Sequence, residues 1–159
     1  MRFKFSPCLL IAVLVLLPAC SSSPAARPDE SMVASRIIDG DTIEVTDAAG
    51  YTEKVRLIGI DTPERGECGF KESGARLSEL ILNSNVLLVT GGTDNQDRYK
   101  RLLRYVDIGV IDAGLVLIQE GFAIARYDSR DGYPQHDRES EYVKADNESP
   151  SFCKSQTGT

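Results

Sequence analysis

The sequence has few histidine and cysteine side chains that could bind a metal, and it has no excess of positive charge. It contains a single histidine, His136, and four cysteines, of which Cys8 lies in a candidate signal peptide and Cys20 is a candidate lipid site. With two cysteines and one histidine left, a zinc site is not expected. The formal net charge of −6 at pH 7 excludes a general electrostatic attraction to nucleic acid or to an anionic membrane. Any phosphate binding must therefore depend on local arginines and on a cation that offsets local carboxylates.

The sequence also lacks an apolar run long enough to span a bilayer. Its main apolar run, Cys8–Leu17, follows a basic start and has the length of a signal-peptide core. A small residue then precedes Cys20 and a run of serines, which resembles the cleavage box of bacterial lipoproteins. That resemblance implies removal of residues 1–19 and lipid attachment at Cys20. Pro18 is unusual in such a box, and cleavage elsewhere by an ordinary signal peptidase is the alternative; a buried N-terminal helix is disfavoured because Pro18 and the serines would end it abruptly.

Four segments are predicted along the chain: a signal peptide at 1–19, a lipidated flexible tether at 20–32, one globular domain at 33–148 and a tail at 149–159. The tether is inferred from its serine, proline and charged residues. The remaining chain, about 140 residues after cleavage, is long enough for one domain with a hydrophobic core. We therefore expect an exported protein of the cell envelope, either anchored to a membrane through Cys20 or secreted.

Two cysteines, Cys68 and Cys153, remain after the signal peptide and the candidate lipid site are set aside. In an oxidising compartment they most simply pair with each other, although free thiols and an intermolecular bridge are alternatives. Closing so long a loop would stabilise the fold by roughly 4–5 kcal/mol in the chain-entropy model, whose mechanism is disputed.

Hydrophobic periodicity predicts a mainly β fold with helices. Alternating or continuous apolar residues predict strands at 33–38, 42–46, 52–60, 85–90 and 101–106. Helical spacing predicts helices at 70–82, between Asp112 and Gly121, and at 135–145. In the middle helix we expect Leu115, Val116 and Ile118 to face inward. The order of these elements is typical of a five-stranded OB-fold barrel with about three α-helices.

The most informative stretch is Val55–Glu64, which reads VRLIGIDTPE and follows shortly after Asp39-Gly40-Asp41-Thr42. The first part reads as a strand that carries Arg56 among apolar residues, and the turn after it bears Asp61 and Glu64. Oxygen ligands for a hard cation, a spare carboxylate and a guanidinium would thus meet on neighbouring strand ends. Metal-assisted phosphodiester chemistry requires that combination.

The chain from about residue 33 to 142 resembles the staphylococcal nuclease, or thermonuclease, family. The resemblance rests on three blocks at compatible spacings, 38–42, 55–64 and 97–103 (IDGDT, VRLIGIDTPE and DRYKRLL), and on a softer fourth block at 117–123. It implies an OB-fold barrel, calcium as cofactor, and hydrolysis of phosphodiester bonds in DNA and RNA with 3′-phosphate products. We expect a monomer that favours single-stranded substrate.

The family's functional positions fall on eight residues of this sequence. Asp41, Asp61 and the Thr62 carbonyl would bind calcium, Glu64 would act on the attacking water, Arg56 and Arg101 would bind the phosphate, and Tyr99 and Tyr127 would contact the nucleotide. Five of them have a simpler interpretation: the two aspartates could shape turns, Glu64 could be a solvated turn residue, and the two tyrosines could pack on the barrel rim. Asp39 could be structural or could reach the ion through water.

Four positions depart from the family or stand outside its pattern. Lys100 and Leu102 flank Arg101 where the family often has glycines, and Ser129 replaces a tyrosine that often follows the position of Tyr127. His136 lies in a charged segment and is expected at the surface. The alternative to a nuclease is a non-catalytic lipoprotein whose OB-fold binds nucleic acid or protein, because a fold alone does not fix a function.

Overall fold

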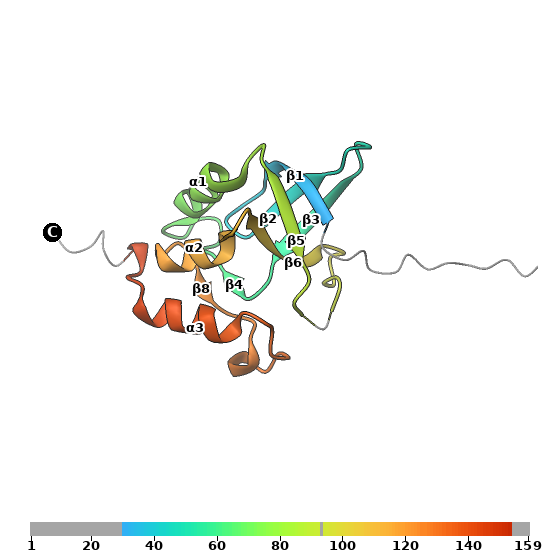
Figure 1. Ribbon diagram of the computed structural model, residues 1–159. Helices are drawn as coiled ribbons and strands as arrows, with labels where there is room; N and C mark the ends of the chain where they lie inside the picture. Colours follow the sequence, from blue (N-terminus) through green and yellow to red (C-terminus); the bar gives the residue numbers. More distant parts are fainter. Residues whose placement is uncertain (1–29, 93, 154–159) are drawn as a thin grey trace, which may run out of the picture.

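The computed structural model describes residues 30–92 and 94–153 (Figure 1). Its strands and helices follow the chain in this order: β1 Glu30–Ile37, β2 Thr42–Thr46, β3 Thr52–Leu57, β4 Ile60–Asp61, α1 Phe70–Ile81, β5 Asn85–Val89, β6 Leu102–Ile108, β7 Ile111–Asp112, α2 Ala113–Gln119, β8 Ile124–Ala125, the 3₁₀ turn η1 Ser129–Asp131, and α3 Glu139–Glu148. No helix among the described residues is long and apolar enough to cross a membrane. Cys20 and the predicted signal peptide lie outside the described residues.

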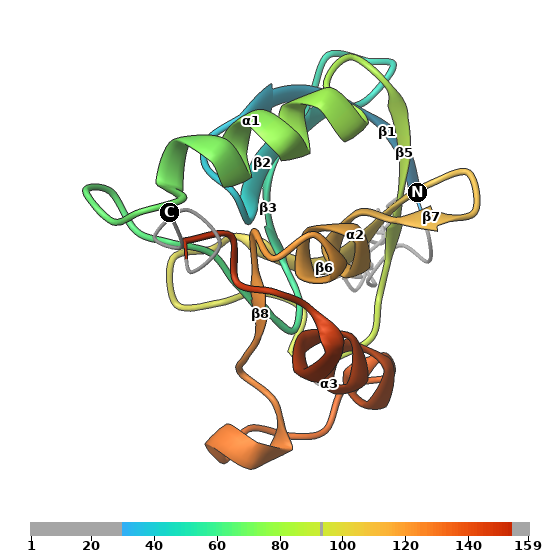
Figure 2. The same cartoon turned by 90° about the vertical axis from the view of Figure 1, so that its left-hand side faces the viewer.

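Five of the strands close into a barrel. They are hydrogen-bonded in the order β3-β2-β1-β5-β6, and a parallel pairing of β3 with β6 joins the two ends. The predicted five-stranded barrel with three helices is therefore confirmed. Both views place α2 between α1 and α3, with α1 against the barrel and α3 farthest from it (Figures 1 and 2).

The core lies inside the barrel and beneath the first two helices. Along β3 and β5 buried side chains alternate with more exposed ones, and the buried residues of the barrel are mostly aliphatic, including Ile43, Val45, Val55, Val86 and Leu88. Burying one such side chain contributes about 1.5–3 kcal/mol.

The expected inner face of α2 was only partly right. Leu117 and Ile118 are fully buried, whereas Leu115 and Val116 are half-buried. The cause is that α2 contacts the barrel strand β6 as well as both α1 and α3. Its buried surface is therefore wider than the single apolar face that the helical spacing predicts.

The predicted strand 52–60 is in fact broken in two. β3 ends at Leu57, Gly59 adopts the left-handed conformation with φ of +75°, and β4 then pairs with β8. A side chain at Gly59 would lie about 2.5 Å from the ring of His136, so this turn requires glycine. The break moves Asp61 out of the barrel sheet and places it beside Ile124 of β8.

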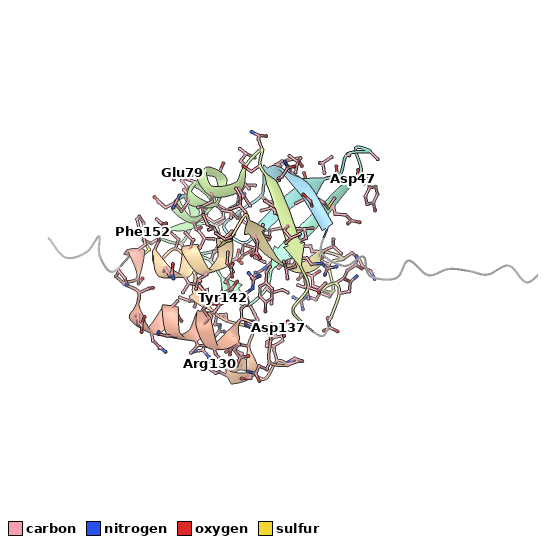
Figure 3. The ribbon with its side chains drawn as sticks, in the orientation of Figure 1. Asp47, Glu79, Arg130, Asp137, Tyr142 and Phe152 are labelled. Carbon is pink, nitrogen blue, oxygen red and sulfur yellow. A yellow bond between two sulfur atoms is a disulfide. The ribbon has the colours of Figure 1, made fainter. Side chains whose placement is uncertain are left out.

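The predicted surface position of His136 was wrong. Only 4% of this residue is exposed, its Nδ1 lies 2.8 Å from the hydroxyl of Tyr105, and its ring packs against that of Tyr142. Tyr142 belongs to α3 (Figure 3). No partner for the Nε2 of His136 is found among the described residues. Because His136 turns inward, α3 begins only at Glu139, four residues later than predicted.

Two ends of the domain also differ from the prediction. β1 begins at Glu30, inside the segment predicted as a tether, and Met32 from that segment is buried. At the other end, the predicted intramolecular disulfide is confirmed: Cys68 and Cys153 are bonded, with their Cα atoms 6.0 Å apart. The Phe152 N–H donates to the carbonyl of Gly121 at 3.1 Å, so residues of the predicted tail pack on the domain.

The buried His136 predicts a pH-dependent stability. Burial lowers the pKa of His136, against the opposing effect of Glu139, Asp128 and Asp137, so the unfolded chain takes up a proton more readily than the folded protein. The free energy of unfolding should therefore fall as the pH drops through the unfolded pKa of about 6.5, and the loss should be complete below the folded pKa.

Urea unfolding between about pH 7.5 and pH 5 checks this expectation. His136→Gln can keep a hydrogen bond to Tyr105 but does not titrate, so its stability should depend less on pH over that range. An equal slope in the two proteins would contradict the role of His136.

Candidate active site

The acidic turn before β2 is tightly built and carries Asp41. The N–H groups of Ile38 and Asp39 donate to the carbonyl of Thr42, and the Asp41 N–H donates to a carboxylate oxygen of Asp39 at 3.2 Å. A side chain at Gly40 would lie within 2.8 Å of Ser73 on α1 and of Thr62, so only glycine allows this turn to approach them.

Asp41 is buried and joined to the second acidic turn. Its Oδ2 accepts hydrogen bonds from the backbone N–H of Thr62 at 3.2 Å and from the Thr62 hydroxyl at 2.9 Å. Its Oδ1 accepts from the hydroxyl of Thr42 at 3.1 Å. The structure therefore brings the two acidic motifs of the sequence together.

Arg56 connects the carboxylates of both motifs. Its Nε lies 3.2 Å from Asp41 Oδ1, and its Nη2 lies 3.7 Å from Asp61 Oδ1. Its Nη1 and Nη2 also donate to the carbonyls of Leu57 and Ile60, at 2.6 and 3.0 Å. These carbonyls flank the Gly59 turn, so the break between β3 and β4 fixes the orientation of the guanidinium.

Arg101 reaches the same region from the loop before β6. Its Nε donates to Asp97 Oδ2 at 2.6 Å, and its Nη1 donates to the hydroxyl of Thr42 at 3.2 Å. Burial raises the pKa of Asp97, but hydrogen bonds from Arg101 and Tyr99 outweigh it and hold that pKa below its ordinary value. Asp97 is thus a charged support for the second arginine.

The departure from the family pattern at Lys100 has a structural consequence. Lys100 adopts the left-handed conformation with φ of +65°, which glycine reaches without steric cost. The loop nevertheless closes, because the Lys100 N–H donates to the carbonyl of Asp97 and the Asp97 N–H donates to the carbonyl of Arg101, both at 3.0 Å. Lysine therefore still allows Arg101 to point to Thr42.

The two predicted tyrosines lie beside different arginines. The hydroxyl of Tyr127 donates to Asp61 Oδ1 at 3.2 Å, and its ring centroid lies 5.5 Å from the Arg56 guanidinium carbon. Burial, and then the charge of Asp61, raise the pKa of Tyr127. Tyr99 is 63% exposed, and its ring centroid lies 5.4 Å from the guanidinium carbon of Arg101.

Glu64 lies on the exposed part of the turn after Asp61. Its N–H donates to the carboxylate of Glu67 at 2.8 Å, and its carbonyl accepts from the Glu67 N–H. Within residues 30–92 and 94–153 its own carboxylate has no hydrogen bond or ion pair. The structure does not join Glu64 to the other site residues, and its assigned role stays a prediction.

The donor set suits a hard cation. Asp41 and Asp61 face one guanidinium, and burial together with the charge of Asp41 raises the pKa of Asp39. Such crowding of carboxylates favours a bound cation. The part of the chain that the structure describes holds no group of three or more histidine, cysteine, aspartate or glutamate side chains for a metal, so water and substrate would complete the shell around the predicted ligands.

Sequence comparison with known proteins finds nucleases. The sequence model described as staphylococcal nuclease homologue matches residues 54–151, which is more than half of the chain. The chain belongs to the staphylococcal nuclease family. It is 32% identical over 143 residues to the thermonuclease of Staphylococcus intermedius, covering 82% of this chain and 81% of that protein. It is 30% identical over 136 residues to an uncharacterized endonuclease of Haemophilus influenzae, covering 86% and 68%.

Membership of the staphylococcal nuclease family makes this chain a nuclease, a hydrolase whose substrate is nucleic acid.

The sequence did not assign a role to Thr42 or to the Asp97 carboxylate. Both side chains lie within the recognised motifs. Thr42 directly follows an acid, Asp41, and Asp97 lies four residues before Arg101, so each is a polar group that could have been expected to hydrogen-bond to a site residue.

Thr42 links the second arginine to the first carboxylate, which predicts a catalytic effect without a folding effect. Thr42→Val keeps the branched side chain of this buried strand position but loses both hydrogen bonds. We expect kcat to fall about tenfold, because one such hydrogen bond contributes about 1–1.5 kcal/mol.

Thr42→Ser, which keeps the hydroxyl, is the matched control and should retain most of the activity. Steady-state kinetics on a single-stranded oligonucleotide measure both variants, and thermal unfolding checks their folds. Equal kcat values in the valine and serine variants would remove the hydroxyl from the mechanism.

Proposed function

We propose that this chain is a calcium-dependent nuclease that cleaves DNA or RNA outside the cytoplasm. The proposal rests on one observation above all: a single largely buried guanidinium, that of Arg56, contacts both Asp41 and Asp61. In a nuclease, this arrangement supplies a phosphate-binding cation directly beside two carboxylates that can bind calcium.

Asp41, Asp61 and the backbone carbonyl of Thr62 would hold the ion. When bound, calcium would polarise a phosphoryl oxygen and neutralise part of the charge of the phosphate. The fixed position of the Asp41 carboxylate comes from the two hydrogen bonds of Thr62.

The two arginines keep donors available for phosphate. A guanidinium has five N–H groups. Arg56 uses its Nε and one N–H on each terminal nitrogen for protein acceptors, and Arg101 uses its Nε and one terminal N–H. The remaining terminal N–H groups can bind phosphate oxygens as negative charge increases in the transition state.

Glu64 would orient or deprotonate the attacking water. Its lack of partners among the described side chains leaves both carboxylate oxygens able to accept a proton. Attack of this water on phosphorus would form one P–O bond and break the bond to the 5′ oxygen, which takes up a proton. The products would carry a 3′-phosphate and a free 5′-hydroxyl.

Release of acid-soluble nucleotides from single-stranded DNA tests the proposal. We expect release in calcium, none in a chelator, and recovery when calcium is restored. Glu64→Gln should lower kcat by about 10²- to 10⁴-fold, which is the usual contribution of a general base.

The matched control is Glu72→Gln, which changes an exposed glutamate in the first turn of α1 and should retain full activity. Activity that persists unchanged in chelator would overturn the calcium assignment. Full activity of a folded Glu64→Gln protein would remove Glu64 from the mechanism.

Export and lipidation at Cys20 form a separate part of the proposal, supported by the apolar run and the small residue before this cysteine. In a bacterial host, the protein should partition with membranes and with detergent. Cys20→Ala should move it to the soluble fraction without loss of nuclease activity. Membrane partitioning that is unaffected by Cys20→Ala would contradict a lipid anchor at this position.

A further inference from the structure

Tyr133 is an exposed aromatic residue that the sequence motifs do not include. It is 52% exposed, and its ring centroid lies 5.7 Å from that of Tyr127. The two ring planes are almost perpendicular, at 88°. Together the rings of Tyr127 and Tyr133 form what we call the aromatic corner, with surface open to solvent on both residues.

The segment that carries the aromatic corner is held by many local hydrogen bonds. Tyr127 has a φ of +60°, and its N–H donates to the carboxylate of Asp131 at 2.8 Å. Asp128 is fully buried; its side chain caps η1 through the Arg130 N–H at 2.9 Å, and its carbonyl accepts from the Tyr133 N–H at 3.1 Å. The rings are therefore positioned before any ligand binds, which reduces the entropy lost on binding.

The aromatic corner borders the catalytic groups. The Tyr127 hydroxyl donates to Asp61, and the Tyr127 ring lies beside the Arg56 guanidinium. The Tyr133 ring packs edge to face on the Tyr127 ring, so Tyr133 is connected to the site through Tyr127. A base is separated from its phosphate by a sugar, so a nucleotide held at Arg56 can place its base beside these rings.

The charges of the segment favour a base over a phosphate as its ligand. Arg126 pairs with Asp131 at 3.1 Å, and Arg130 pairs with Asp128 at 2.6 Å. Both cations are thus compensated within the segment, while the aromatic surface remains exposed. Aromatic faces of this kind stack on unpaired bases of any sequence.

We propose that Tyr133 stacks on a nucleobase next to the cleaved phosphodiester, with Tyr127 as the second wall of the subsite. This inference rests on the proposed nuclease function and adds a substrate-binding residue to it. Since a base must be unpaired to enter the aromatic corner, the subsite also predicts a preference for single strands.

The test compares binding of oligonucleotides with and without bases. Fluorescence anisotropy in calcium measures the affinity of the Glu64→Gln protein, in which we expect cleavage to be slow, for labelled oligothymidylate and for an oligomer of the same length with abasic residues. Adding Tyr133→Ala should weaken binding to oligothymidylate about five- to 150-fold, which corresponds to roughly 1–3 kcal/mol for the loss of one stacking residue. Binding to the abasic oligomer should not change.

Two further variants serve as controls. Tyr133→Phe keeps the ring and should bind like its parent. Tyr51→Ala removes a tyrosine of similar exposure, 61%, from the hairpin next to Asp47, at the other end of the molecule from Arg130 and the aromatic corner (Figure 3). It should leave both affinities unchanged.

Each other outcome has a defined meaning. Unchanged oligothymidylate binding in Tyr133→Ala, or an equal loss on the abasic oligomer, would overturn the stacking role. If the protein with Glu64 intact cuts no polynucleotide, the proposed function fails separately, and the ratio of the two affinities still decides the role of Tyr133.

Discussion

The ion pairs of Arg56 with Asp41 and Asp61 are the interaction on which the candidate site depends. The two aspartates come from different turns, and the arginine lies at the end of the strand between them in sequence. A buried guanidinium is stable only when its charge and its N–H groups have partners. Leu57 and Ile60 provide carbonyls for this purpose only because the chain turns at Gly59. The break in the strand is thus a requirement of the site as well as a feature of the fold.

The same constraint explains how an acidic protein can bind a polyanion. The site holds its positive charge on two oriented arginines and does not depend on a basic surface. Asp97 and Thr42 hold Arg101, while carboxylates and carbonyls hold Arg56. Carboxylates that restrain the arginines also repel phosphate, and the proposed calcium ion would offset that repulsion. The carboxylates of Asp41 and Asp61 would therefore both orient Arg56 and bind the proposed cation.

Much of the site could be predicted because its residues lie in short motifs at strand ends. The barrel strands, the three helices and the pairing of the two acidic turns follow from local patterns of apolar and polar residues. The Gly59 turn could not be predicted in this way, because glycine is also tolerated in strands and the cause lies in a ring far along the chain. For the same reason His136 looked like a surface residue: its neighbours in sequence are charged, and its contacts with Tyr105 and Tyr142 are long-range.

The turn that carries Glu64 depends on a different kind of support. Its described hydrogen bonds are local, between Glu64 and Glu67, and it contributes no side chain to the barrel core. A disulfide connects this turn to the C-terminal tail, because Cys68 is bonded to Cys153. The tail in turn packs on the domain through the contact between Phe152 and Phe122. A disulfide can order such a segment only where thiols are kept oxidised, which supports the proposal that this nuclease acts outside the cytoplasm. The barrel thus positions the groups proposed to bind phosphate, while the covalent link restrains the loop that begins with the residue proposed to act on water.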